Sequence, residues 1–113
     1  MTETLSEAIE ALARPFMEGV ETLPTARNCF TLVTTAWNMT LVSPKEKEDL
    51  FDGLVASFGE TLSVAERVTL AAMIAAIEQR KQELFPEDRR FVVSFEIEEA
   101  SDKWDLQVAS IAV

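Results

Sequence analysis

The side chains of this sequence that could do chemistry are carboxylates and guanidinium groups. Asp and Glu number 20 against 10 Lys and Arg, and histidine is absent from all 113 residues. Histidine is the commonest general base near neutral pH and the commonest metal ligand. Its absence excludes Ser-His-Asp and Cys-His nucleophiles and His-bearing zinc sites. The sequence also lacks a glycine-rich phosphate loop, a Cys-x-x-Cys pair and a Gly-x-Ser-x-Gly motif.

The densest acidic segment opens a predicted helix and contains Glu46, Glu48, Asp49 and Asp52. Asp52 shares a helical face with Glu48 and with Asp49, and carboxylates alone can hold Mg²⁺ or Ca²⁺. Acids are also favoured in the first turns of a helix, where they interact with the macrodipole and stay solvated. Since no calcium-loop spacing accompanies them, we predict no metal and no cofactor here.

An arginine pair follows the last predicted helix, in the stretch Glu87-Asp88-Arg89-Arg90. Two guanidinium groups can hold a carboxylate or a phosphate through paired hydrogen bonds. The other interpretation is a solvated connector whose charges pair locally. We take Arg89 and Arg90 as candidate partner-binding residues.

The last 23 residues carry five acids and one base. With one tryptophan, these acids form the second set of candidate partner-binding residues: Glu96, Glu98, Glu99, Asp102, Trp104 and Asp105. Clustered acids steer a basic partner, and tryptophan commonly anchors interfaces. Acids that serve solubility alone and a tryptophan that packs in the core would give the same pattern.

Net charge and apolar content limit the classes of partner. A net charge of −10 disfavours nucleic acid and anionic membrane surfaces, because both attract Lys and Arg. The longest strongly apolar run, Val68–Ile77, is about half the length of a membrane span. The single Cys29 fits a reducing compartment and a buried position. The acidic start lacks a basic segment and an apolar one, so we expect no signal peptide and a cytoplasmic location.

Helix signals are clear in the first three quarters of the chain. Capping boxes begin at Thr4, Ser43 and Ser63, and Pro15 predicts a break near Arg14. Apolar residues spaced by three or four predict a further helix that opens at Pro24 or Thr25 and includes Ala26, Phe30, Val33, Trp37 and Leu41. A strand is the competing interpretation there, because several residues are β-branched. Val68–Ile77 is apolar on nearly every side, which predicts the helix at the centre of the fold.

After Pro86 the apolar period changes to two. Phe91, Val93, Phe95 and Ile97 predict one strand, and Trp104, Leu106 and Val108 a second, with a polar turn between them. The alternation slips between Val108 and Ile111, which indicates a bulge or burial on both faces. We therefore predict an α+β fold in a single domain, residues 1–113. Residues 1–90 are mainly helical, with about four helices, and residues 91–113 form a β-hairpin.

A hairpin leaves unpaired N–H and C=O groups along its outer edge. We expect that edge to be used, either in a homodimer with a four-stranded antiparallel sheet or with another protein's strand. The function hypothesis is a non-catalytic interaction module for a basic protein partner, in its sharper form an inhibitor or immunity-type protein. The alternative is a small-molecule- or metal-binding protein or enzyme that uses carboxylates with Arg89 and Arg90.

Overall fold

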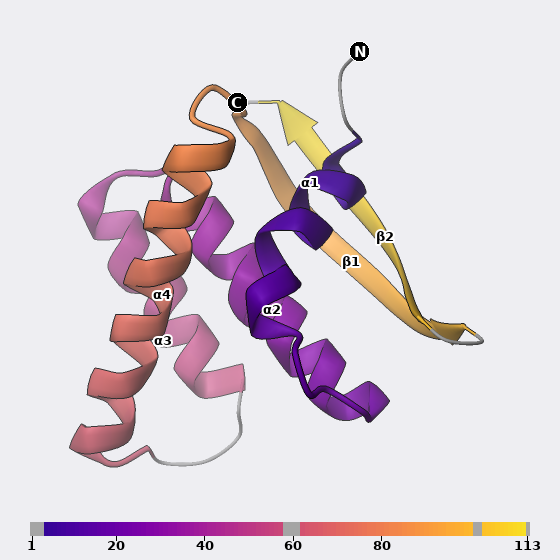
Figure 1. Ribbon diagram of the computed structural model, residues 1–113. Helices are drawn as coiled ribbons and strands as arrows, with labels where there is room; N and C mark the ends of the chain where they lie inside the picture. Colours follow the sequence, from indigo (N-terminus) through magenta and orange to yellow (C-terminus); the bar gives the residue numbers. More distant parts are fainter. Residues whose placement is uncertain (1–3, 58–61, 101–102, 113) are drawn as a thin grey trace.

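The computed structural model describes residues 4–57, 62–100 and 103–112. Within these ranges the chain folds into helices followed by an antiparallel two-stranded hairpin (Figure 1). The elements are α1 (Leu5–Ala13), α2 (Leu23–Met39), α3 (Pro44–Ser57), α4 (Val64–Leu84), β1 (Arg90–Ala100) and β2 (Lys103–Ala112). The predicted α+β class, with four helices before a C-terminal hairpin, is confirmed.

The helices begin where the sequence supplies caps. The Thr4 hydroxyl accepts a hydrogen bond from the Glu7 N–H at 3.2 Å, at the start of α1. Ser63 and Glu66 form a reciprocal capping box at the start of α4, each bond 3.1 Å long. At the other end of α1, Pro15 lies in a short 3₁₀ segment, as the predicted break requires.

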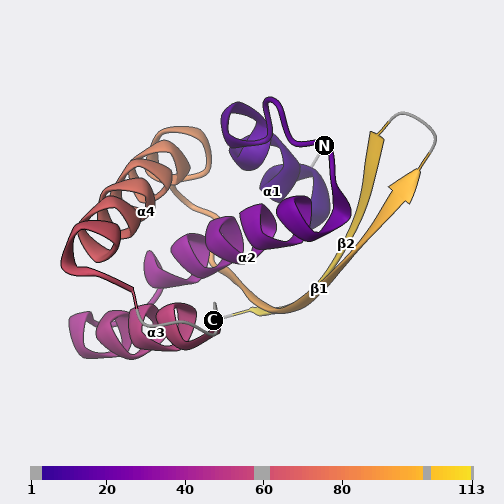
Figure 2. The same ribbon diagram turned by 90° about the horizontal axis from the view of Figure 1, so that it is seen from below.

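The segment for which helix and strand competed is helix α2, and it is the centre of the fold. It contacts α1, α3, α4 and β1. The two views place it between the hairpin on one side and α3 and α4 on the other (Figures 1 and 2). Ala36 and Trp37 are fully buried in it. The Thr34 hydroxyl donates to the Phe30 carbonyl at 2.7 Å, so this polar residue is satisfied within the helix.

The prediction that α4 is the central helix is wrong. Its buried residues lie on one face: Leu70, Ile74, Ile77 and Lys81. Val64 is 80% exposed and Val68 is 63% exposed. An alanine-rich helix is apolar all round whether or not neighbours cover it, so its sequence pattern overstated its burial.

The hairpin packs one face against α1 and α2. Ile97 pairs with Leu106 on that face, and both are buried. The register shifts between Val92 and Ser94, so Val93 is an extra residue in β1 and is 60% exposed. The predicted alternation from Phe91 through Val93 to Ile97 is therefore broken. The bulge lies in β1, opposite the stretch of β2 where the sequence pattern slips.

Among the described residues, no helix is both long enough and apolar enough to cross a bilayer.

Candidate functional site

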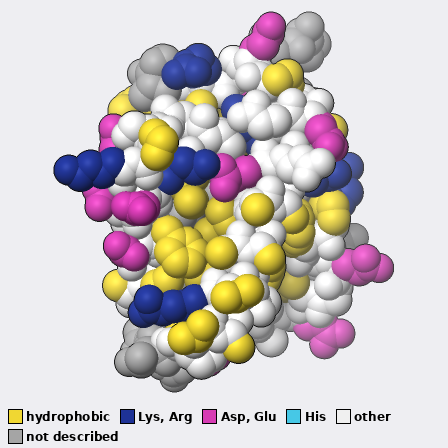
Figure 3. Space-filling model, turned by 90° about the vertical axis from the view of Figure 1, so that its left-hand side faces the viewer, with side chains coloured by type: hydrophobic (Ala, Val, Ile, Leu, Met, Phe, Trp, Pro, Cys, Tyr) yellow, Lys and Arg dark blue, Asp and Glu magenta, His cyan; other side chains and the backbone are white. Residues whose placement is uncertain are grey.

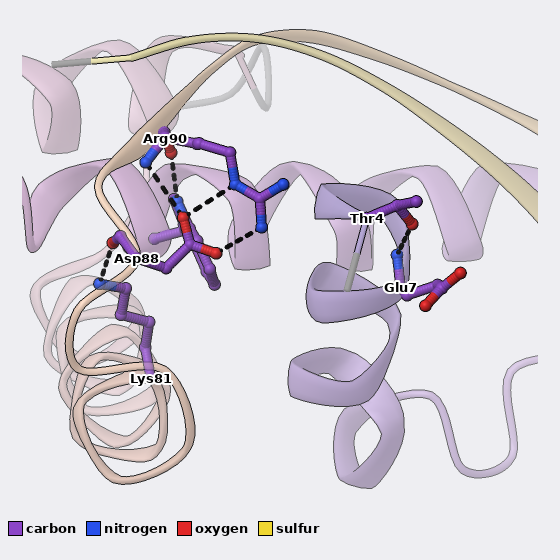
Figure 4. Close-up of polar contacts among 6 residues, drawn as sticks. Thr4, Glu7, Lys81, Asp88 and Arg90 are labelled. Carbon is purple, nitrogen blue, oxygen red and sulfur yellow. Dashed lines mark hydrogen bonds and ion pairs between the residues drawn. The ribbon is translucent and has the colours of Figure 1, made fainter. Parts of the chain in front are cut away.

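Arg90 holds the carboxylate of Asp88 through two parallel hydrogen bonds. The Nε–Oδ1 distance is 3.0 Å and the Nη2–Oδ2 distance is 2.6 Å (Figure 4). The backbone N–H of Arg90 also donates to Asp88 Oδ1 at 3.1 Å. The hydrogen bonds from Arg90 hold the pKa of Asp88 below its ordinary value, although partial burial opposes them. Arg90 is thus paired with a neighbouring residue of the connector, which is one of the two interpretations of the arginine pair. Arg89 is exposed.

Lys81 is a buried cation that sequence analysis did not single out. It is 1% exposed, and its Nζ donates to the Asp88 carbonyl at 2.7 Å (Figure 4). The same Nζ lies 4.9 Å from the centre of the Trp37 ring, a cation–π contact. Burial lowers the pKa of Lys81, and the nearby Asp88 acts in the opposite direction. Lys81 follows Ile77 by four residues and so lies on the same helical face, and this spacing could have indicated that Lys81 is buried.

Two residues of α2 contact the start of β1. The indole N–H of Trp37 donates to the Arg90 carbonyl at 2.7 Å. The carboxamide of Asn38 accepts from the Val92 N–H at 2.8 Å and donates to the Val92 carbonyl at 2.9 Å. These bonds, with those of Lys81 and Arg90, fix the path from α4 into the hairpin. This junction is therefore structural in character.

The outer face of the hairpin brings three predicted acids together. Glu98 lies directly opposite Asp105, and Glu96 lies two residues before Glu98 on the same face. All three are exposed, and no described residue forms an ion pair with any of them. Like charges in directly opposed positions destabilise a ladder, so Glu98 and Asp105 repel one another in the free protein.

The other candidates of the hairpin lie elsewhere. Glu99 is exposed and pairs across the ladder with Trp104, which is half-buried and packs against the core. Because successive residues alternate between faces, this pair is on the side opposite Glu98 and Asp105. Asp102 lies outside the described residues.

Parts of both hairpin edges are covered by helices. Asn38 occupies the edge of β1 at Val92, and the Ser6 hydroxyl accepts from the Val108 N–H of β2 at 3.2 Å. Further along β1, Arg27 and Thr31 of α2 line a groove of about 540 Å³ with residues 95–98. The outer face, unlike these edges, has no helix packed on it (Figure 2).

The acids of α3 and the single thiol were the other chemically capable groups. Glu48, Asp49 and Asp52 are exposed. No group of three or more Cys, Asp or Glu side chains in the described part of the chain is placed to hold a metal ion. Cys29 is half-buried with its Sγ 3.6 Å from the Phe16 carbonyl, and burial raises the pKa of its thiol.

Comparison with known proteins found no matching family model, no matching curated protein and no matching solved structure.

Proposed function

We propose that this protein is a non-catalytic interaction module that binds a basic protein partner through the outer face of its hairpin. The residues in contact with the partner are Glu96, Glu98 and Asp105. In the sharper form of the proposal the module is an inhibitor, whose acids enter a basic cleft and block access to it.

The observation that carries the proposal is the direct opposition of Glu98 and Asp105. In the free protein this pair costs roughly 0.2 to 1 kcal/mol relative to a neutral pair. A Lys or Arg side chain placed between the two carboxylates removes the repulsion and gains charge-assisted hydrogen bonds. Binding of a basic partner therefore recovers energy that the isolated hairpin lacks.

The fold supports this use of the face. The opposite face of the ladder is fixed to α1 and α2 through Leu106 and Ile97, so the acids are held on a rigid element. The last residues of β1 and the first residues of β2 extend past the helices (Figure 2), which gives a partner room to approach. A net charge of −10 adds long-range attraction for a basic surface.

The test compares two variants that lose the same number of charges. The hairpin variant carries Glu96→Gln, Glu98→Gln and Asp105→Asn. The control carries Glu48→Gln, Asp49→Asn and Asp52→Asn on α3, where the acids are also exposed. Partners captured from lysate of the source organism by the wild type are purified, and their affinities are measured by calorimetry at low and high salt.

We expect a basic protein whose affinity falls at least tenfold for the hairpin variant and changes little for the α3 control. Its binding should also weaken as salt rises, because the attraction is between exposed charges. An equal loss of affinity in both variants would show that binding depends on net charge and not on the outer face of the hairpin, which would contradict the proposal. So would a partner that both variants bind as tightly as the wild type.

A further inference from the structure

One side of α4 is apolar and uncovered. Successive residues of an α-helix are rotated by about 100° around its axis. The residues on the side of α4 opposite the buried Leu70 and Ile74 therefore follow from their positions in the sequence. We call this side the α4 outer face. Its exposed residues are Val64, Ala65, Val68, Ala71, Ala72, Ala75 and Ala76. No other element of the described chain is packed on it.

This face continues into further apolar surface. Met73, at its border, is 39% exposed. Beside the N-terminal half of α4, an open apolar groove is lined by Leu62, Ala65, Glu66, Thr69, Leu70 and Met73. The face of the molecule made by α3 and α4 shows clustered hydrophobic side chains with acidic and basic side chains around them (Figure 3). Large apolar patches with a charged rim are typical of protein interfaces.

The charges beside the outer face match a second copy of the same helix. Arg67 and Glu78 lie on the same flank of α4, at about the same angle around the helix. Glu78 forms an ion pair with Lys47 at 2.9 Å, which places this flank on the side of α3. Arg67 and Glu78 are also equally distant in sequence from the pair Ala72–Met73.

We propose that the α4 outer face binds the α4 outer face of a second copy, with the two helices antiparallel. A two-fold axis at Ala72–Met73 puts Arg67 of each chain beside Glu78 of the other. Each Glu78 then lies between two cations, its own chain's Lys47 and the opposite chain's Arg67. A parallel pairing would instead put the flanks that carry Arg67 and Glu78 on opposite sides of the helix pair, so these charges would not meet.

The residue sizes also suit this pairing. Alanines at the centre of the face let two helix axes approach to about 8 Å. The helix has 21 residues and is therefore about 31 Å long, which gives an extended contact. The sequence pattern of Val68–Ile77, apolar nearly all round, is then explained, because the second copy covers what the chain itself leaves exposed.

The test is a charge exchange at the two flanking positions. Arg67→Glu and Glu78→Arg each place like charges at both symmetric contacts of a homodimer. Mixing the two variants restores attraction at both contacts. By sedimentation velocity over a concentration series, we expect the wild type to dimerise, each variant alone to dimerise at least tenfold more weakly, and the equimolar mixture to recover the dimer.

Two further variants separate this surface from the hairpin. Ala72→Glu, at the axis, should abolish the dimer, and Ile111→Asp on the hairpin should leave it intact. Both side chains are exposed, and circular dichroism will check that each variant is folded. A wild type that stays monomeric up to about 200 µM overturns the proposal, and so does a dimer that Ile111→Asp disrupts while Ala72→Glu does not.

Discussion

The carboxamide of Asn38 takes the place of a neighbouring strand for Val92. It donates to the Val92 carbonyl at 2.9 Å and accepts from the Val92 N–H at 2.8 Å, across 54 residues of sequence. Both residues are buried. A helix side chain thus satisfies the two backbone groups that an edge strand would otherwise leave unpaired next to a bulge.

Asn38→Ala should destabilise the protein by about 2 to 4 kcal/mol, because two buried backbone groups lose their partners. The measurement is equilibrium unfolding in urea. Asn28→Ala is the matched control, since Asn28 lies exposed on the same helix and should change stability by less than about 0.5 kcal/mol. Similar losses for the two variants would show that Asn38 contributes only helix propensity.

The volume of the Lys81 side chain should contribute more to the stability of the fold than its charge does. Lys81→Met keeps an unbranched side chain beside Trp37 and removes a buried cation whose desolvation is costly, so we expect a change within about 1 kcal/mol. Lys81→Ala leaves a cavity and should cost about 2 to 4 kcal/mol. Urea unfolding of both variants tests this. A loss in Lys81→Met as large as that in Lys81→Ala would assign the stability to the ammonium group and its bond to Asp88.

The pairing of Asp88 with Arg90 predicts a loss of stability in acid. The pKa of Asp88 is lower in the folded protein than its ordinary value of 3.8, so the folded state binds protons less readily than the unfolded chain. The stabilisation is therefore present above pH 3.8 and disappears as the pH falls through the folded pKa.

Asp88→Asn should consequently be less stable than the wild type near neutral pH, by about 1 kcal/mol. The difference should narrow in acid, at a pH below 3.8, as the folded pKa of Asp88 is approached. Urea unfolding at the two pH values gives the comparison, with Asp49→Asn as the exposed control. A gap that stays constant with pH would mean that the ion pair contributes nothing and that only geometry was lost.

The acidic pair of the hairpin predicts a variant that is more stable and binds less well. Glu98→Lys places opposite charges at the Glu98–Asp105 position and should stabilise the protein by about 0.5 to 1 kcal/mol. Glu48→Lys makes the same change in net charge on α3. Thermal unfolding at low salt should show the gain for Glu98→Lys and a smaller one for Glu48→Lys. Equal gains would mean that net charge, and not the cross-strand pair, sets the effect.

Local sequence patterns predicted the helices and the two strands. The cap at Ser63 and the break at Pro15 lie where the structure has them, because both depend on backbone groups a few residues away. The hairpin follows from a period of two between polar turns. The acids Glu96, Glu98 and Asp105 come together for the same reason, since strand register is set locally by the turn.

The arrangement of those elements was less predictable. Thr34 and Asn38 are polar residues buried in α2, one satisfied by its own helix and the other by Val92. The pairing of Asn38 with Val92 joins residues far apart in sequence, and no periodicity reports such a contact. The position of Val93 in the bulge likewise depends on the strand opposite, so the slip seen in the sequence of β2 is accommodated in β1.

The hydrogen bonds from α2 to β1 also determine how this protein unfolds. The indole of Trp37 and the amide of Asn38 both donate hydrogen bonds to β1, so the interior of the helical part is completed only when β1 docks. A two-stranded hairpin is in turn marginal without a surface to pack on. The helices and the hairpin therefore gain their stability in one step, and unfolding should be a single cooperative transition. A chain divided between Glu87 and Asp88 should yield neither a stable helical fragment nor a stable hairpin.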